Sequence, residues 1–281
     1  MKQQKRIAFI TSGLPTGGAE LVLVSLLSRL DRDRFDPLVI SLRGEGDLGP
    51  AIRDLDIPVL SLRLAPKPSL PVEIIKGVRT LRLFNPDVIQ GWMYHGNLFS
   101  WLATPFMRRR PRLLFSIHNA LSDWASERRL TRQIIRLNGI VSGGADRVIY
   151  PSEPSAIQHE AIGYPRDRTQ IIPNGFDCER FKPDPEDRAK IRSELGFTDQ
   201  DFVIGMAARY HPVKDHATLL AAVRDTVDRC PSTRLLLCGP GVDEKNPQLQ
   251  SLIQKHGLHK VVKLLGNRRD MPRVYRAMDL L

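Results

Sequence analysis

Residues 203–223 read VIGMAARYHPVKDHATLLAAV, and this stretch decides the predicted fold. It continues a short apolar run that starts at residue 202 and predicts a buried parallel strand. Beyond the loop that follows, Leu219, Leu220 and Val223 have the spacing of an amphipathic helix. A strand, a loop and a helix in this order form the repeating unit of a doubly wound α/β sheet.

Two cations, Arg209 and Lys214, lie in that loop. They fall between the carboxyl end of a strand and the N-terminus of a helix, where open α/β sheets bind ligands and where anions are favoured. An arginine offers a fork for two phosphate oxygens, and a lysine offers a point charge. The pattern therefore predicts a diphosphate clamp. The alternative is two solvated cations in a surface loop.

The loop Ala208–Lys214 resembles the R-x₄-K loop in the second domain of family-4-type retaining glycosyltransferases, which have the two-domain GT-B fold. That family usually has glycine before the arginine, where this chain has Ala208. The resemblance runs through most of the chain, and the order and spacing of its pieces make it specific. The further pieces are Gly17-Gly18-Ala19-Glu20, Ser116-Ile117-His118-Asn119, Pro173-Asn174-Gly175-Phe176-Asp177, Leu237-Cys238-Gly239-Pro240-Gly241 and Leu264-Leu265-Gly266.

The amino-acid composition limits the kinds of binding partner and the cellular compartment that we expect for this protein. The 281 residues are 42% hydrophobic and 26% charged, which is typical of a soluble globular protein. The net charge of +11 favours a polyanionic partner, but no nucleic-acid recognition motif accompanies it, so we expect no nucleic acid. Three widely spaced cysteines without a CxxC motif argue against a zinc site or a disulfide framework and predict a reducing cytoplasm. Polar residues, glycine and proline interrupt the apolar residues 88–107, so no membrane span is expected there.

Alternating strands and helices predict an α/β protein with parallel sheets. The expected architecture is GT-B-like, with two Rossmann-like, doubly wound domains facing a cleft. We expect an acceptor-side domain over 1–180, a linker and lead-in helix over 181–200, and a nucleotide-sugar-side domain over 201–281. The last range shows three strands, whereas such a domain normally has about six. In the resembled family the chain continues to a loop with two glutamates, beyond Leu281 here. We therefore expect a truncated, weakly stable second domain and little turnover from this segment alone.

Gly17 and Gly18 separate the first predicted strand from a helix, which makes them a candidate phosphate cradle. The segment is not GxGxxG and has no P-loop lysine, so neither dinucleotide nor ATP binding follows. The alternative is a tight turn with positive φ at Gly17 or Gly18. The resemblance implies that the backbone here approaches the donor sugar and phosphate.

His118 ends a predicted strand, a position that suits either chemistry or a satisfied hydrogen bond. The resemblance implies that it contacts the donor sugar beside the reacting carbon. His95 and Asn97 follow another strand and are candidates for the acceptor side. Their alternative is a packing role beside Trp92 and Trp101.

Five further residues are donor-binding candidates, although each also fits a plain turn. Asn174-Gly175 is a strong turn dipeptide, which the resemblance places at the cleft. Gly239 permits close approach of backbone to a ligand. Gly266 and Asn267 begin a loop that runs along the nucleobase in the resembled family.

Basic residues gather in two places, a turn before one strand and a helix after it. The helix has arginines every four residues and Leu130, Ile134 and Leu137 on another face, which is typical of membrane-surface helices. A solvated flank of a core helix is the alternative. Members of the resembled family act on lipid-linked acceptors, so an anionic membrane is a candidate partner. The residues are Arg108, Arg109, Arg110, Arg128, Arg132 and Arg136.

The resemblance implies transfer of a sugar, with retention, from a nucleotide-diphosphate donor to a glycan or lipid-linked acceptor. Such transfer serves polysaccharide or glycolipid synthesis, and the enzyme would be cytoplasmic and peripheral to the inner face of the membrane. Arg209 and Lys214 would stabilise the leaving diphosphate. No DxD-type acidic pair is suitably placed, so we expect no metal, and no cofactor besides the donor. Two alternatives stay open: a nucleotide-sugar 2-epimerase on the same fold, and a non-catalytic sugar-nucleotide-binding module.

Overall fold

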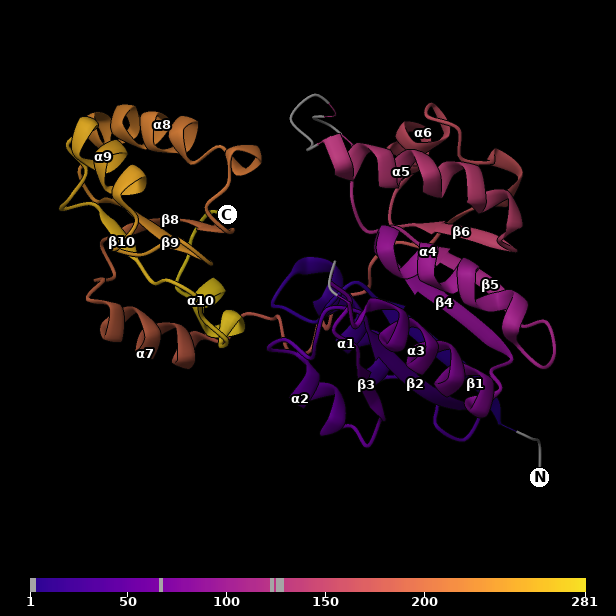
Figure 1. Cartoon of the computed structure of the whole chain (residues 1–281). Helices are drawn as coiled ribbons and strands as arrows, with labels where there is room; N and C mark the ends of the chain where they lie inside the picture. Colours follow the sequence, from indigo (N-terminus) through magenta and orange to yellow (C-terminus); the bar gives the residue numbers. More distant parts are fainter. Residues whose placement is uncertain (1–3, 66–67, 122–123, 125–128) are drawn as a thin grey trace. The chain divides into compact units, whose positions relative to one another are not determined.

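The computed structural model describes residues 4–65, 68–121, 124 and 129–281. The chain forms two compact units, residues 1–175 and 176–281 (Figure 1). Arg128 lies outside the described residues.

The first unit is built on a seven-stranded sheet in the order β3-β2-β1-β4-β5-β6-β7. Every neighbouring pair in it is parallel, as predicted, so the carboxyl ends of the strands lie at one edge. The strands are β1 (Lys5–Thr11), β2 (Phe35–Ser41), β3 (Val59–Ser61), β4 (Val88–Trp92), β5 (Arg112–Ser116), β6 (Arg147–Tyr150) and β7 (Thr169–Ile171).

Helices cover both faces of this sheet, because successive strand residues point to opposite sides. Phe9 packs with α1 and α2 on one face, whereas Ala8 and Ile10 belong to the cluster that includes the other four helices. The first layer is α1 (Gly18–Ser28) and α2 (Gly49–Arg53), and the second is α3 (Leu70–Phe84), α4 (Met93–Ala103), α5 (Arg129–Val141) and α6 (Glu153–Glu160). Short 3₁₀ turns are η1 (Thr104–Phe106), η2 (Ser142–Gly144) and η3 (Arg166–Arg168).

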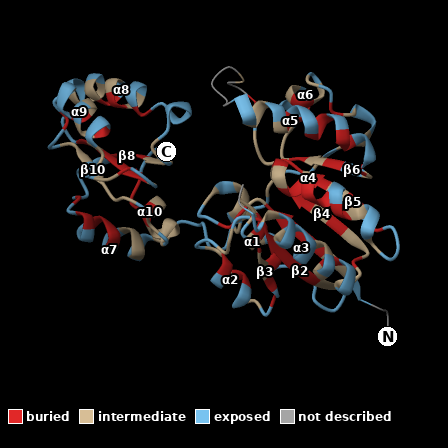
Figure 2. Ribbon diagram, in the orientation of Figure 1, coloured by how far each residue is buried: buried red, intermediate tan, exposed pale blue. Residues whose placement is uncertain are grey.

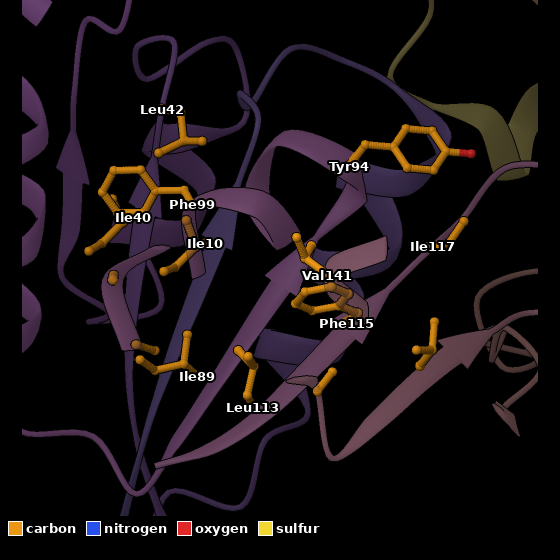
Figure 3. Close-up of a cluster of buried hydrophobic side chains, with 14 of the residues drawn as sticks. Ile10, Ile40, Leu42, Ile89, Tyr94, Phe99, Leu113, Phe115, Ile117 and Val141 are labelled. Atoms are coloured by element: carbon orange, nitrogen blue, oxygen red, sulfur yellow. The ribbon is translucent and has the colours of Figure 1, made fainter. Parts of the chain in front are cut away.

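The larger core lies under the second layer. Figure 3 shows Ile10, Ile40 and Ile89 from the strands with Phe99 from α4. Sequence analysis assigns no helix to residues 93–103, because α4 is largely buried and lacks a simple polar face. Gly96 lets α4 approach the sheet, since an added Cβ would lie 2.1 Å from the carbonyl oxygen of Ile10.

The second unit has a three-stranded parallel sheet, ordered β10-β9-β8. Its strands are β8 (Phe202–Ala207), β9 (Thr233–Cys238) and β10 (Val262–Leu264), and its helices are α7 (Pro185–Leu195), η4 (Pro212–Lys214), α8 (His216–Arg229), α9 (Pro247–Lys255) and α10 (Met271–Arg276). Leu280 forms a parallel bridge with Ile204 beside β8. The helix expected to lead into this domain is α7, which packs in its core through Ile191 and Leu195.

The described helices include none with both the length and the apolar character that a membrane crossing needs.

Candidate functional site

In the second unit, three loops meet at the carboxyl edge of the sheet. The backbone N–H of Ala208 donates to the carbonyl of Cys238 at 2.9 Å, and that of Tyr210 donates to Pro240 at 2.9 Å. The N–H of Gly239 donates to the carbonyl of Gly266 at 2.8 Å. The loops that carry Arg209, Gly239 and Gly266 therefore form one hydrogen-bonded rim.

Gly239 makes this rim possible. Its φ is +143°, and an added Cβ would lie 2.2 Å from the carbonyl oxygen of Ala208. The missing side chain thus allows the loop after β9 to touch the loop after β8. Gly266 also has a left-handed backbone, with φ +61°, and Asn267 beside it is exposed.

Arg209 and Lys214 are exposed on this rim. Neither side chain makes a hydrogen bond or an ion pair with any residue that the structure describes. Most arginines around α7 and α10 are paired; Arg188 and Arg192, for example, both bind Asp279. Lys214 ends η4, directly before the N-terminus of the 14-residue α8. Two uncompensated cations beside a helix N-terminus make a favourable place for an anion.

The junction between η4 and α8 has an unusual backbone. Asp215 adopts φ +48°, and its Oδ1 accepts the N–H of Thr218 at 3.2 Å. Hydrogen bonding by the side chain of Thr218, and then by its backbone N–H, lowers the pKa of the Asp215 carboxyl. His216 follows and is buried 5.2 Å from the Tyr210 ring, so its pKa is lowered by burial. The capped junction therefore sets the position of Lys214, the last residue of η4, relative to the N-terminus of α8.

In the first unit, Gly17 is the N-cap of α1 and has φ −150°. Gly18 is not among the residues with positive φ, so the alternative of a positive-φ turn at this pair is wrong. An added Cβ at Gly17 would lie 2.3 Å from Oε2 of Glu20, the end of a flexible side chain that folds back against this glycine. Burial raises the pKa of that carboxyl. An added Cβ at Gly18 would meet nothing within 4 Å, so the backbone there is open.

Trp92 links this loop to His118. The two rings are stacked, with centroids 4.3 Å apart and planes at 22°. Nε1 of Trp92 donates to the carbonyl of Ala19 at 2.9 Å. The structure therefore brings together the first turn of α1, the end of β4 and the residues that follow β5.

His118 has two buried ring nitrogens without a hydrogen-bond partner among the described residues. Burial lowers its pKa to about 4, and a weaker interaction with the Asn174 side chain acts in the opposite direction. The ring is therefore neutral at physiological pH. Unsatisfied buried nitrogens need an explanation, and a ligand that supplies the missing partner would provide one. Asn174 and its neighbour Gly175 thus lie near His118.

The two acceptor-side candidates, His95 and Asn97, differ in burial and in the groups that they contact. Asn97 is fully buried, and its Oδ1 accepts the backbone N–H of Ser116 at 3.3 Å. We therefore give it a structural role between α4 and β5. His95 is partly exposed, and its pKa is lowered by burial and then by the charge of Arg43.

Sequence reasoning missed three residues at this edge. Trp92 was considered only as a packing neighbour, although it supports His118. Met93 adopts φ +64°, a strained conformation for a long side chain, and its sulfur lies 3.3 Å from the backbone nitrogen of His118. Arg43 lies near His95 because β2 and β4 flank β1. A left-handed methionine leaves no signal in a sequence.

The predicted basic residues differ in their partners. Arg109 pairs with Asp87 at 2.9 Å, and the guanidinium of Arg136 lies 5.6 Å from the Trp124 ring centre. Arg108 and Arg110 are exposed, and Arg132 is partly exposed.

Comparison with known proteins decides the family. Residues 16–180 match the family described as Glycosyltransferase Family 4, and residues 187–281 match Glycosyl transferases group 1. The chain belongs to Glycosyltransferase Family 4. This confirms the resemblance, and it supports a glycosyltransferase but not the 2-epimerase alternative.

Three similar proteins illustrate the match. EpsF of Bacillus subtilis is 23% identical over 99% of this chain and 72% of its own length. The D-inositol 3-phosphate glycosyltransferase of Nocardia farcinica is 31% identical over 49% of this chain and 32% of its own. A GDP-mannose-dependent alpha-(1-6)-phosphatidylinositol monomannoside mannosyltransferase of Mycolicibacterium smegmatis is 29% identical over 54% of this chain and 37% of its own. This glycosyltransferase chain thus spans about a third of the latter two relatives.

Solved structures confirm the fold of this family-4 chain. HepE of Anabaena, in complex with UDP-glucose, has a TM-score of 0.83 and 27% identity over 98% of this chain and 72% of its own. A sucrose-phosphate synthase of Thermosynechococcus elongatus has a TM-score of 0.75 and 18% identity over 98% and 74%. The α/β fold with two parallel sheets is GT-B-like, as predicted.

Proposed function

We propose that this glycosyltransferase takes a sugar from a nucleotide-diphosphate donor and transfers it, with retention and without a metal, to a glycan or lipid-linked acceptor. One observation carries the proposal: Arg209 and Lys214 stand uncompensated on a rim of three hydrogen-bonded loops before α8. Similarity to HepE, whose structure contains UDP-glucose, supports this class of donor.

The proposed roles follow from charge. Negative charge develops on the departing diphosphate as the bond between sugar and phosphate oxygen breaks. Arg209 and Lys214 stabilise that charge, and the N-terminus of α8 adds its dipole. Gly239, Gly266 and Asn267 complete the rim, where backbone can come close to the nucleotide.

The first unit supplies the sugar side of the proposal. His118, held by Trp92, offers unpaired nitrogens to the donor sugar. A Cβ added at Gly18 would meet nothing within 4 Å, so the start of α1 leaves open space for the donor. Asn174 and Gly175 lie near His118 and complete this side of the proposed site. His95 with Arg43 faces the acceptor in this scheme. The mannosyltransferase relative is named for a phosphatidylinositol acceptor, which supports a lipid-linked acceptor and a role in glycolipid or polysaccharide synthesis.

The clamp is tested by calorimetric titration of UDP and GDP into the wild type and single variants. Arg209→Ala and Lys214→Ala should each weaken binding at least tenfold, because each removes a charge-assisted hydrogen bond of about 1.5–3 kcal/mol. Arg209→Lys should fall in between, since lysine keeps the charge but not the fork. Lys255→Ala on α9, an exposed lysine in the same unit, is the matched control. Equal binding by Arg209→Ala and the wild type would refute the clamp.

A second assay separates transferase from binding module. Radiolabelled UDP-glucose is incubated with lipid extract, and product and free UDP are followed. Transfer that is lost in Arg209→Ala supports the enzyme. Tight nucleotide binding without any sugar release from the donor favours the non-catalytic module.

A further inference from the structure

Two arginines face each other where β2 and β3 end. These strands are parallel, but beyond them Arg43 and Arg63 form an isolated antiparallel bridge. The backbone N–H of Leu64 donates to the carbonyl of Leu42 at 2.9 Å, which holds the two chain segments together. Strand β2 is buried over most of its length (Figure 2), whereas both arginines are exposed. The backbone therefore fixes two exposed cations opposite each other.

Like charges that face each other across an antiparallel pair are destabilising, because their Cβ atoms are only about 4.5–5.5 Å apart. Within the described chain, neither guanidinium makes an ion pair or a hydrogen bond. Glu45, two residues after Arg43, is instead paired with Arg53 at 2.6 Å. Glu73 accepts the backbone N–H of Arg63 at 3.3 Å, so it places one negative charge beside the two positive ones. An anion bound between the two arginines would offset the charge that Glu73 leaves.

The two arginines lie beside the switch point of the sheet. Open α/β sheets bind ligands outside the carboxyl ends of the strands where the strand order reverses, which is here between β1 and β4. A Cβ added at Gly13, in the loop after β1, would lie 3.8 Å from Cβ of Arg43. Burial, and then the charge of Arg43, lowers the pKa of His95, which follows β4, so these two side chains lie close together. Arg43 thus adjoins residues that follow both strands of the switch point.

We propose that Arg43 and Arg63 bind a phosphate group of the acceptor, so that the acceptor is a phosphate ester of a sugar, a polyol or a lipid. Each guanidinium can donate two parallel hydrogen bonds to phosphate oxygens, and two guanidiniums match the charge of a phosphate dianion. A neutral glycan would leave the repulsion between the two arginines in place. The inference rests on the proposed function, because it names the chemical class of the acceptor that the first unit receives.

The binding test is calorimetric titration of the whole chain in excess UDP, so that the proposed clamp is filled. The probes are inorganic phosphate, inositol 1-phosphate and farnesyl phosphate, of which the last two represent a soluble and a lipid source of the same group. We expect at least one ester to bind fivefold or more tighter than inorganic phosphate, and the tighter ester identifies the source. Esters that bind no tighter than inorganic phosphate would mean an adventitious ion only and would overturn the proposal.

Variants test whether the two arginines hold the phosphate. Arg43→Gln and Arg63→Gln should each weaken binding of the tighter ester at least tenfold, because each removes one of two charged forks. Arg43→Lys should weaken it less, since lysine keeps the charge but not the fork. The matched control is Arg79→Gln on α3, an exposed arginine of the same unit without an ion pair among the described residues, which should stay within twofold. Equal losses in Arg43→Gln and Arg79→Gln would refute the assignment.

Melting temperatures separate phosphate binding from a structural role. Without ligand, Arg43→Gln and Arg63→Gln should melt at or above the wild-type temperature, because each relieves the repulsion between facing charges. The tighter ester should raise the melting temperature of the wild type but not of these variants. Lower melting temperatures in both ligand-free variants would contradict the proposal. Titration of UDP into Arg209→Ala tests the clamp in the second unit, so the proposed donor site and this acceptor site can fail independently.

Discussion

Asp215 illustrates how single residues shape the clamp, because it combines a strained backbone with a helix cap. Its φ of +48° is unfavourable for an L-residue, and its carboxylate accepts the N–H of Thr218. We predict that Asp215→Ala lowers the melting temperature by a few degrees, since it keeps the strain and loses the cap. The melting temperature of Asp215→Gly should fall less, because glycine relieves the backbone strain. Asp215→Asn, which retains both features, is the control, and a glycine variant less stable than the alanine variant would contradict this account.

His118 makes a prediction about pH. Its pKa is about 4 in the folded protein, against 6.5 for the ordinary group, because burial disfavours the charged ring. Between these values His118 binds more protons in the unfolded chain, so its contribution to the free energy of unfolding falls as pH decreases from 6.5 towards 4 and is constant above that window. In His118→Phe, which can keep the stack on Trp92, this fall should be smaller.

Urea denaturation at several pH values between 6.5 and 4 measures this fall in the free energy of unfolding. His95, His159 and His216 have lowered pKa values too, so the difference between wild type and variant is the quantity to compare. An identical pH dependence in both proteins would rule out His118 as a source.

At the scale of elements, Arg192 of α7 holds the end of the chain in place. It is 4% exposed, and its guanidinium donates to the carbonyls of Ala277 and Thr198 at 3.2 and 2.8 Å, to that of Asp201, and to the carboxylate of Asp279 at 3.1 Å. Arg192→Leu leaves these acceptors short of a partner. We predict a loss of about 3–5 kcal/mol in the free energy of unfolding of the second unit.

The matched control is Arg224→Leu on α8. Arg224 is more exposed, and among the described residues its ion-pair partner is Asp228 alone, so its loss should cost less than about 1 kcal/mol. Equal losses in the two variants, measured by urea denaturation followed by circular dichroism, would show that burial of Arg192 is not what matters.

For the whole molecule, the two units should respond separately to local damage, since each has its own core. Gly239→Ala strains the second unit by roughly 1–3 kcal/mol through its backbone alone. All three tryptophans, Trp92, Trp101 and Trp124, lie in the first unit. We predict that Gly239→Ala lowers the unfolding transition seen by circular dichroism but not the one seen by tryptophan fluorescence.

Gly143→Ala is the control for this experiment, since an added Cβ there meets nothing within 4 Å. It should leave both transitions unchanged. A fluorescence transition that shifts together with the dichroism in Gly239→Ala would mean that the units unfold as one.

The sequence by itself determined the order of strands and helices, the parallel sheets and the family. Apolar runs between turn residues and the pieces around Gly17, His118 and Arg209 are local patterns, and local patterns survive in a sequence. Helix α4 escaped because its polar residues are buried, so it lacks the period of an amphipathic helix.

Only the tertiary structure decided which residues share a site and which do not. It stacked Trp92 on His118, buried Asn97, and gave Gly17 an extended backbone where a turn was possible. It also left Leu130 and Ile140 in solvent beside unpaired arginines. The physical reason is that burial and contact depend on residues far apart in the chain, which a sheet brings to one edge and which no local pattern records.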